Sequence, residues 1–240
     1  MPHSLLISDL HLCETRPHTT ALFHHFIQRI APAADALYIL GDLFEYWAGD
    51  DDLATPLHQD ISSSLQALGN QGTRIFIMHG NRDFLMQANL ASACHATLLE
   101  DPALLELYGT PTLLTHGDAL CTDDHAYQAF REEVRKGAWQ QGFLALPLAQ
   151  RKAQIEALRM RSEQEKQHKT MEIMDVNADA VFALLRQHGY PRLIHGHTHR
   201  PARHQHEVDG HLCERWVLAD WDEHGAALRC DAQGCKVIQL

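Results

Sequence analysis

The 240-residue chain lacks several features that mark other classes of protein. None of its six cysteines forms a Cys-x-x-Cys pair, so nothing indicates a thiolate zinc site or a dithiol redox motif. No apolar run reaches the ~20 residues that a membrane-spanning helix needs. Neither a P-loop nor a Gly-x-Gly-x-x-Gly motif is present, so a nucleotide would bind as a substrate and not through those phosphate cradles.

A secretory signal is also missing, since the apolar run from Ser4 to Ile7 begins almost at once. We therefore expect a cytoplasmic protein with reduced thiols. Cys230 and Cys235 are close enough in sequence to pair across a hairpin, but reduced thiols are the favoured interpretation. Any membrane association is expected to be peripheral.

Positive charge is scarce in the chain as a whole. The net charge of −11 argues against nucleic acid as a general partner, and no obligate protein partner is evident. The distribution is uneven, however, because residues 131–169 hold nine Lys or Arg against five Asp or Glu, a local charge of +4. Such a segment is typical of one that meets an anionic ligand or an anionic membrane surface.

Short apolar runs alternate with amphipathic stretches through the first half of the chain. We expect buried strands at residues 5–7, 36–40, 74–78 and 112–115, and helices at 20–30 and 57–68. After residues 193–194, short alternating runs predict a β meander over residues 202–208, 215–218 and 226–240. This order predicts an α/β layered fold that forms a single domain over residues 1–240.

Residues 123–187 interrupt this pattern and are predicted to form an inserted helical cap. The segment is rich in Ala, Gln, Glu, Leu, Lys and Arg, and apolar residues around Trp139 and Phe143 precede basic residues from Arg151 onward. An apolar groove with cationic edges would accept acyl chains and a diphosphate together, and would touch an anionic membrane. The alternative is an ordinary helical hairpin with a solvated basic face.

Each of the four predicted strands, and a late strand at residues 193–194, ends in a polar cluster. The clusters are Asp9-Leu10-His11, Gly41-Asp42, Gly80-Asn81-Arg82-Asp83, His116-Gly117-Asp118 and Gly196-His197-Thr198-His199. Loops at the carboxyl ends of strands converge in open α/β sheets, so we expect these clusters to face one place. They supply seven nitrogen and oxygen ligands and no sulfur, a set that suits Mn²⁺, Fe²⁺ or Zn²⁺. The alternative is that these residues only cap strands and fill polar turns.

The ligand set is large enough for two divalent ions. Two ions ~3.5–4 Å apart clamp a phosphoryl group and activate a water molecule, and they need a shared ligand, for which Asp42 is the candidate. Two divalent ions held by only two Asp carboxylates and the neutral Asn81 would leave the site with a net positive charge, which favours binding of a phosphate anion.

The five motifs, in this order, resemble the calcineurin-like metallophosphoesterase superfamily. The resemblance implies a four-layer αββα sandwich with the helical segment as an insertion. It also implies a first metal held by Asp9, His11 and His199, a bridge at Asp42, and a second metal held by Asn81, His116 and His197.

One position departs from many members of that superfamily, in which a histidine follows the asparagine; here the residue is Arg82. An arginine does not release a proton at working pH, but it grips phosphate with two hydrogen bonds. Arg82 therefore favours a leaving group that is itself a phosphate, which points to cleavage of a diphosphate. The predicted catalytic residues are Arg82 and the seven ligands.

A narrower resemblance covers the sequence that surrounds the motifs, at residues 7–12, 41–47, 49–52, 80–85, 116–124 and 194–201. These segments are similar to UDP-2,3-diacylglucosamine diphosphatases of lipid A synthesis. The similarity implies two Mn²⁺ ions, water attack on the α-phosphorus of UDP-2,3-diacylglucosamine, and the products UMP and 2,3-diacylglucosamine 1-phosphate. It implies a location at the cytoplasmic face of the inner membrane, and substrate contacts at Asn81, Arg82, Asp124, Ser162, Lys166, Lys169 and His197.

Two rival functions remain open at this point. One is a soluble nucleotide phosphodiesterase or pyrophosphatase on the same fold. The other is a non-catalytic scaffold that binds a partner protein through the cap, although such scaffolds usually lose metal ligands and this chain has all seven.

Overall fold

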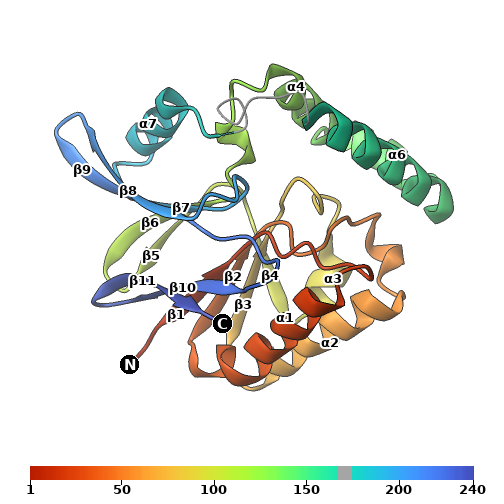
Figure 1. Ribbon diagram of the computed structural model, residues 1–240, viewed down its shortest axis with the longest axis horizontal. Coiled ribbons are helices and arrows are strands. Elements are labelled where there is room, and N and C mark those ends of the chain that lie inside the picture. Colours follow the sequence, from red (N-terminus) through yellow and green to blue (C-terminus); the bar gives the residue numbers. More distant parts are fainter. Residues whose placement is uncertain (167–174) are drawn as a thin grey trace.

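Two β-sheets lie face to face at the centre of the molecule, and helices cover their outer surfaces (Figure 1). The computed structural model describes the backbone of residues 1–166 and 175–240, and the side chains of all of these except residues 163–166.

The first sheet has six strands in the order β11-β10-β1-β2-β3-β4. They are β1 (Ser4–Ile7), β2 (Ala36–Leu40), β3 (Arg74–Met78), β4 (Ala96–Leu99), β10 (Ala226–Asp231) and β11 (Gly234–Gln239). Strands β1 to β4 run parallel, and β10 and β11 add an antiparallel edge. Every residue of β1 and β2 is buried, which explains their continuous apolar sequences.

The second sheet has five strands in the order β5-β6-β7-β9-β8. They are β5 (Ala103–Leu107), β6 (Thr110–Thr115), β7 (Arg192–His195), β8 (Ala202–Val208) and β9 (His211–Val217). Strands β6, β7 and β9 are parallel to one another. The carboxyl ends of β6 and β7 therefore lie at the same edge of the sheet.

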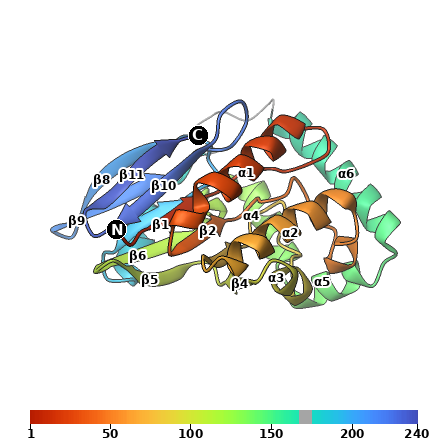
Figure 2. The ribbon, with the colours of Figure 1, turned by 90° about the horizontal axis from the view of Figure 1, so that it is seen from below.

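Helices on both outer faces complete four layers. Helices α1 (Pro17–Arg29), α2 (Pro56–Asn70) and α3 (Ala88–Ala93) lie against the first sheet, as the view from below shows (Figure 2), and α7 (Ala178–Gln187) lies against the second. Three apolar clusters fill the spaces between the layers. One joins α1 and α2 to the first sheet, one lies between the sheets, and one joins α7 to the second sheet. The expected four-layer αββα sandwich is confirmed.

The predicted strands and helices of the first half are confirmed within a few residues, as is the meander after β7. The short elements α3, β4 and β5 were not predicted. Helix α3 has only six residues, too few for a periodic apolar pattern, and β4 and β5 are mostly only partly buried, unlike the predicted strands β1 and β2. Short 3₁₀-helices at Ala31–Ala33, Asp50–Asp52 and Asp118–Leu120 lie in connecting loops.

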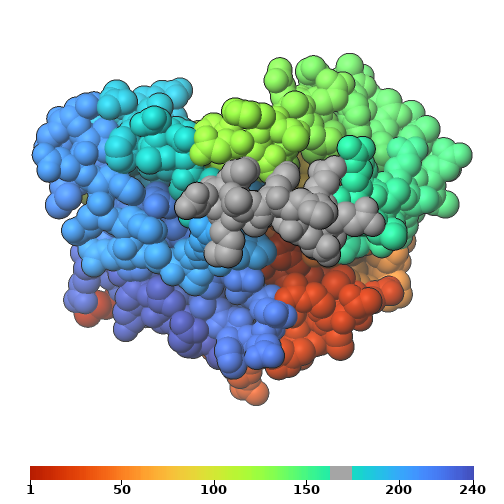
Figure 3. Space-filling model, turned by 45° about the horizontal axis from the view of Figure 1, so that its top comes forward, coloured from red at the N-terminus to blue at the C-terminus, as the bar shows by residue number. Residues whose placement is uncertain are grey.

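Helices α4 (His125–Val134), α5 (Gly137–Leu144) and α6 (Leu148–Lys166) project beyond the sheets, and we call these three the cap (Figure 1). The predicted insertion, 123–187, also included α7, which instead forms the outer layer over the second sheet. The buried Arg151 of α6 fastens the cap to the loop after β2, since its guanidinium contacts the carbonyl of Ala48 and the carboxylate of Asp51. In Figure 3 the cap (green) lies next to an early part of the chain (orange).

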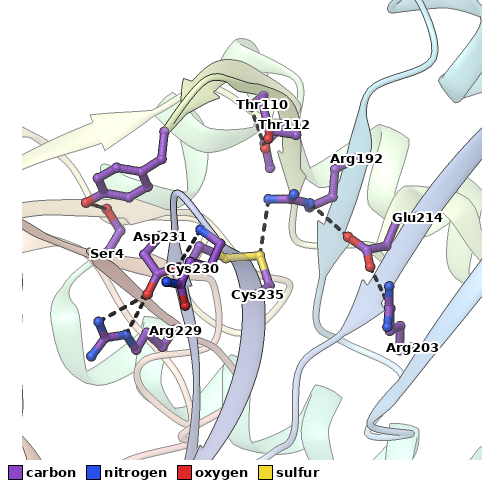
Figure 4. Close-up of a disulfide and its surroundings, with 12 residues drawn as sticks. Ser4, Thr110, Thr112, Arg192, Arg203, Glu214, Arg229, Cys230, Asp231 and Cys235 are labelled. Atoms are coloured by element: carbon purple, nitrogen blue, oxygen red, sulfur yellow. Dashed lines mark hydrogen bonds and ion pairs between the residues drawn. A yellow bond between two sulfur atoms is a disulfide. The ribbon is translucent and has the colours of Figure 1, made fainter. Parts of the chain in front are cut away.

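The expectation of reduced thiols is wrong for one pair, because Cys230 and Cys235 form a disulfide (Figure 4). The two residues are directly paired across the antiparallel strands β10 and β11, and their Cα atoms are 4.2 Å apart, close enough for the sulfurs to bond. Cys13, Cys94 and Cys213 are free. Among the described residues we find no helix with the length and hydropathy of a transmembrane span.

Candidate metal centre

The loops that follow β1, β2, β3, β6 and β7 meet at one edge of the two sheets and bring the five polar clusters together. Main-chain hydrogen bonds join neighbouring loops, from the amide of Asp9 to Gly41 (3.1 Å) and from the amide of Gly196 to His116 (2.9 Å). The amide of His197 donates to Oδ2 of Asp9 at 2.9 Å, which links the two sheets. The convergence follows from the parallel strand order.

Five of the seven predicted ligands have backbone conformations that non-glycine residues rarely adopt. They are Asp9 (φ 55°), His11 (φ 50°), Asp42 (φ 52°), His197 (φ 68°) and His199 (φ 53°). A positive φ costs an L-residue ~1–2 kcal/mol, so it persists only where the surrounding structure enforces it. Such strain collects at functional sites, because it aims side chains in directions that relaxed backbone does not provide.

The first group of converging atoms belongs to Asp9, His11 and His199, a set whose ligand atoms lie close enough together to hold one metal ion. Nε2 of His11 lies 3.4 Å from Nε2 of His199, which lies 3.4 Å from Oδ1 of Asp9. Oδ2 of Asp9 accepts hydrogen bonds from Ser8 Oγ and from the His197 amide. The buried Oδ1, by contrast, accepts no well-aligned hydrogen bond from any described residue. An orphaned anionic oxygen facing two imidazole nitrogens fits a cation.

The second group of converging atoms lies beside the first. Nε2 of His116 is 3.1 Å from Oδ1 of Asn81, and the ring of His116 lies 5.1 Å from that of His197. Oδ2 of Asp42 is 3.8 Å from Nε2 of His116 and 3.9 Å from Nε2 of His11. This oxygen therefore lies between the two groups, where a shared ligand belongs. By distance alone, Asp9 also joins Asp42 and His116 in a possible ligand set.

Close packing fixes the Asp42 carboxylate. Its Oδ1 accepts a hydrogen bond from the Arg82 amide at 2.8 Å. A Cβ built on Gly80 would lie 2.0 Å from the same oxygen, so only glycine fits there. The buried Asp83 holds the loops around it, accepting from the amides of Leu43 and Gly80, both at 2.8 Å. Burial and the neighbouring Asp42 raise the pKa of Asp83 to about 6.

The carboxylates shape the charge of the histidines in the metal-free protein. Burial opposes a charged ring, but Asp42, Asp9 and Asp118 together raise the pKa of His116 to about 9. Asp220 and Asp9 likewise outweigh burial and raise the pKa of His199 to about 10. Burial, assisted by His116, lowers the pKa of His197 to about 4. The carboxylates thus favour positive charge on one ring of each group, as binding of cations also requires.

Comparison with known proteins agrees with this geometry. Residues 3–201 match the family described as calcineurin-like phosphoesterase. The chain belongs to this family.

Several curated relatives of this phosphoesterase cover nearly its full length. The UDP-2,3-diacylglucosamine hydrolase of Aromatoleum aromaticum is 58% identical over 234 residues, which span 98% of this chain and 95% of the relative. The protein of the same name from Aeromonas hydrophila is 48% identical and spans 95% of this chain and 94% of its own length. Among solved structures, an archaeal phosphodiesterase aligns with 99% of both chains at 12% identity and a TM-score of 0.47, a similarity too low to carry an argument.

The other predicted site residues have different surroundings in this phosphoesterase. Nη1 of Arg82 lies 3.8 Å from Oε1 of Glu45, at the edge of the ligand cluster. Asp124 caps α4, accepting a hydrogen bond from the Tyr127 amide at 3.1 Å. Ser162 is half-buried on α6. The side chain of Lys166 and all of Lys169 lie outside the described residues.

Two carboxylates at the site were missed by sequence reasoning. Oε2 of Glu45 lies 3.2 Å from Nδ1 of His11, and Oδ2 of Asp220 lies 3.2 Å from Nδ1 of His199. A histidine that binds a metal through one nitrogen commonly presents the other to a carboxylate, which fixes the ring and raises its basicity. That rule predicts such partners, but only the fold identifies which acidic residues they are.

Proposed function

We propose that this phosphoesterase hydrolyses the diphosphate bond of UDP-2,3-diacylglucosamine, releasing UMP and 2,3-diacylglucosamine 1-phosphate. The observation that carries the proposal is the position of the Asp42 carboxylate between two clusters of nitrogen and oxygen ligands. The shared name of the full-length relatives supplies the substrate.

Two divalent ions are proposed to bind here, with Mn²⁺ as the preferred metal. The first would be held by Asp9, His11 and His199, and the second by Asn81, His116 and His197, with Asp42 between them. All donors are nitrogen or oxygen, and the set contains no thiolate, which suits Mn²⁺. Bound ions would supply an activated water and stabilise negative charge on the phosphoryl group.

Arg82 is proposed to hold the diphosphate. Its main chain is fixed by the hydrogen bond from its amide to Asp42 and by the one that its carbonyl accepts from the Trp47 amide (3.2 Å). The guanidinium thus stays beside the ligand cluster, where it can grip a phosphate with two hydrogen bonds. Since the leaving group is then a phosphate anion, it needs little help from a general acid.

A substitution tests this role. Arg82→His should lower kcat/KM for the diphosphate by ~100-fold or more, because a charge-assisted contact to the reacting group is lost. Arg29→His, at the exposed end of α1, serves as the control and should change nothing. Unchanged diphosphate hydrolysis in Arg82→His would remove this part of the proposal.

The cap is proposed to bind the lipid part of the substrate and to contact an anionic membrane surface at the cytoplasmic face of the inner membrane. The proposed substrate contacts are Asp124, Ser162, Lys166 and Lys169, in or next to the cap, and Asn81, Arg82 and His197 near the metals. Leu158 and Met160 of α6 expose 42% and 60% of their surface, in a helix that also carries Arg161. Apolar and basic side chains on one helix are typical of interfacial binding.

Phosphorus NMR of the reaction run in ¹⁸O-water tests the whole proposal. Full-length protein with Mn²⁺ should place the label in UMP, because water attacks the α-phosphorus. Label in the lipid phosphate would overturn the assignment of the attacked phosphorus. Faster turnover of water-soluble nucleotide diphosphates than of the lipid would instead favour a soluble pyrophosphatase.

A further inference from the structure

Glu45 connects three parts of the molecule that are distant in the sequence. It lies in the loop after β2, three residues beyond Asp42, and 16% of its side chain is exposed. Oε2 lies 3.2 Å from Nδ1 of His11. Oε1 accepts a hydrogen bond from Nη2 of Arg159 on α6 at 2.8 Å and lies 3.8 Å from Nη1 of Arg82.

The contact with His11 bears on metal binding. Nε2 of this ring faces His199 and Asp42, so this nitrogen is the one available to a cation. The ring proton must then sit on Nδ1, where Glu45 is the facing carboxylate. A carboxylate in this position selects the tautomer, fixes the ring plane and strengthens the metal bond.

The contacts with the two arginines bear on the substrate side of the site. Glu45 lies between the guanidinium groups of Arg82 and Arg159, which would otherwise repel each other. Its carboxylate therefore faces two guanidinium groups on one side and the His11 ring on the other, which favours its charged form.

The contact with Arg159 also attaches the middle of α6 to the metal centre. Arg151 and Lys152 fasten the beginning of the helix, at Asp51 and Asp52 respectively. Arg159 lies two turns further along, and its guanidinium also lies 5.9 Å from the ring centre of Tyr46, the residue after Glu45. The middle of the helix thus rests on the loop that carries Asp42 and Glu45.

We propose that Glu45 is a positioning residue that couples the seating of cap helix α6 to the orientation of His11 and Arg82. This inference rests on the metal site proposed above and adds a link between that site and the cap. Because coupling is reciprocal, metal binding at His11 should stabilise the seating of α6, and loosening Arg159 should weaken metal binding.

Titration of the metal-free, full-length protein with Mn²⁺ tests the first half of the proposal. Glu45→Gln keeps the shape of the side chain and removes its charge, and we expect the Kd for Mn²⁺ to rise ~10- to 100-fold. The matched control is Glu156→Gln, because Glu156 also pairs with Arg159 (3.0 Å) but lies on α6 itself, with 60% of its side chain exposed. The control should bind Mn²⁺ within twofold of wild type.

Two further measurements test the coupling. Mn²⁺ should slow amide exchange over residues 155–162 in the wild type and not in Glu45→Gln. Arg159→Gln should raise the Kd for Mn²⁺ several-fold in the wild-type background and have no further effect in Glu45→Gln. If Glu45→Gln does not fold, Arg159→Gln alone still tests the link between the cap and the metal centre.

The outcomes separate this inference from the proposed function. Wild-type protein that binds Mn²⁺, together with a Glu45→Gln variant of equal affinity, overturns the positioning role. Additive effects of Arg159→Gln and Glu45→Gln overturn the coupling. A wild-type protein that binds no Mn²⁺ contradicts the proposed metal centre itself.

Discussion

Gly80→Ala should disable the metal centre through a steric effect alone. The added Cβ would lie 2.0 Å from Oδ1 of Asp42 and 2.4 Å from its amide nitrogen. The φ of Gly80 is outside the left-handed region, so the substitution adds no backbone strain of its own. Ordinary van der Waals contact begins near 3.4 Å, so the Asp42 carboxylate and the Cβ must separate by more than 1 Å.

That displacement changes two contacts of the Asp42 carboxylate. It breaks the hydrogen bond from the Arg82 amide to Asp42 and moves Oδ2 away from its place between His11 and His116. A ligand misplaced by ~1 Å costs about 100-fold in rate, and overpacking costs ~1–3 kcal/mol in free energy of unfolding. We expect kcat/KM for UDP-2,3-diacylglucosamine to fall about 100-fold, measured as UMP release at saturating Mn²⁺.

Gly142→Ala is the matched control. Gly142 lies in α5, and a Cβ there would meet no atom within 4 Å. Alanine in a helix interior is favoured over glycine by about 1 kcal/mol, so this variant should be slightly more stable and fully active. A folded Gly80→Ala protein with kcat/KM within fivefold of wild type would refute the reasoning, because the tight contact with Asp42 would then be irrelevant to the site.

Three further predictions concern other parts of the molecule. Asp220→Asn removes the carboxylate that lies 3.2 Å from Nδ1 of His199, and we expect the Kd for Mn²⁺ to rise about tenfold, as measured by calorimetry. An unchanged Kd would show that Asp220 does not orient His199. The apparent affinity for Mn²⁺ should rise with pH. The pKa values of His199 (about 10) and His116 (about 9) keep both rings protonated at neutral pH in the metal-free protein, and a binding ion must displace these protons. Titrations between pH 6 and 8 check this sign, and a flat profile would contradict it. Cys235→Ser should lower the free energy of unfolding by about 2 kcal/mol under oxidising conditions, the value for so short a loop, and by much less with dithiothreitol present.

The sequence predicted best those features in which a functional residue directly follows a recognisable buried strand. Asp9 and Asp42 follow buried strands directly, and the carboxyl ends of parallel strands meet at one edge, so motif position alone predicted that they would lie together. The layered α/β fold was predictable for the same reason, because buried parallel strands have continuous apolar sequences.

Other features depend on contacts between distant segments, which periodicity does not encode. Glu45 and Asp220 are single acidic residues in loops, and only the folded chain brings them to His11 and His199. Helix α7 has the composition of the cap helices, but its buried Val181 and Leu185 pack on the second sheet.

The disulfide was missed for a similar reason. Whether Cys230 and Cys235 can bond depends on strand register, and the hairpin of β10 and β11 places them in direct opposition. Nη1 of Arg192, on the second sheet, lies 3.2 Å from the sulfur of Cys235, so the bond also lies at a contact between the two sheets (Figure 4).

The central claim is that seven residues from five loops form one centre for two metal ions. Electron paramagnetic resonance during titration of the metal-free protein with Mn²⁺ tests this claim most directly. We predict two bound Mn²⁺ per chain, with magnetic coupling between them, because the Asp42 carboxylate would be shared by the two proposed sites. Binding of a single ion, or of two ions that show no coupling, would contradict a dinuclear centre.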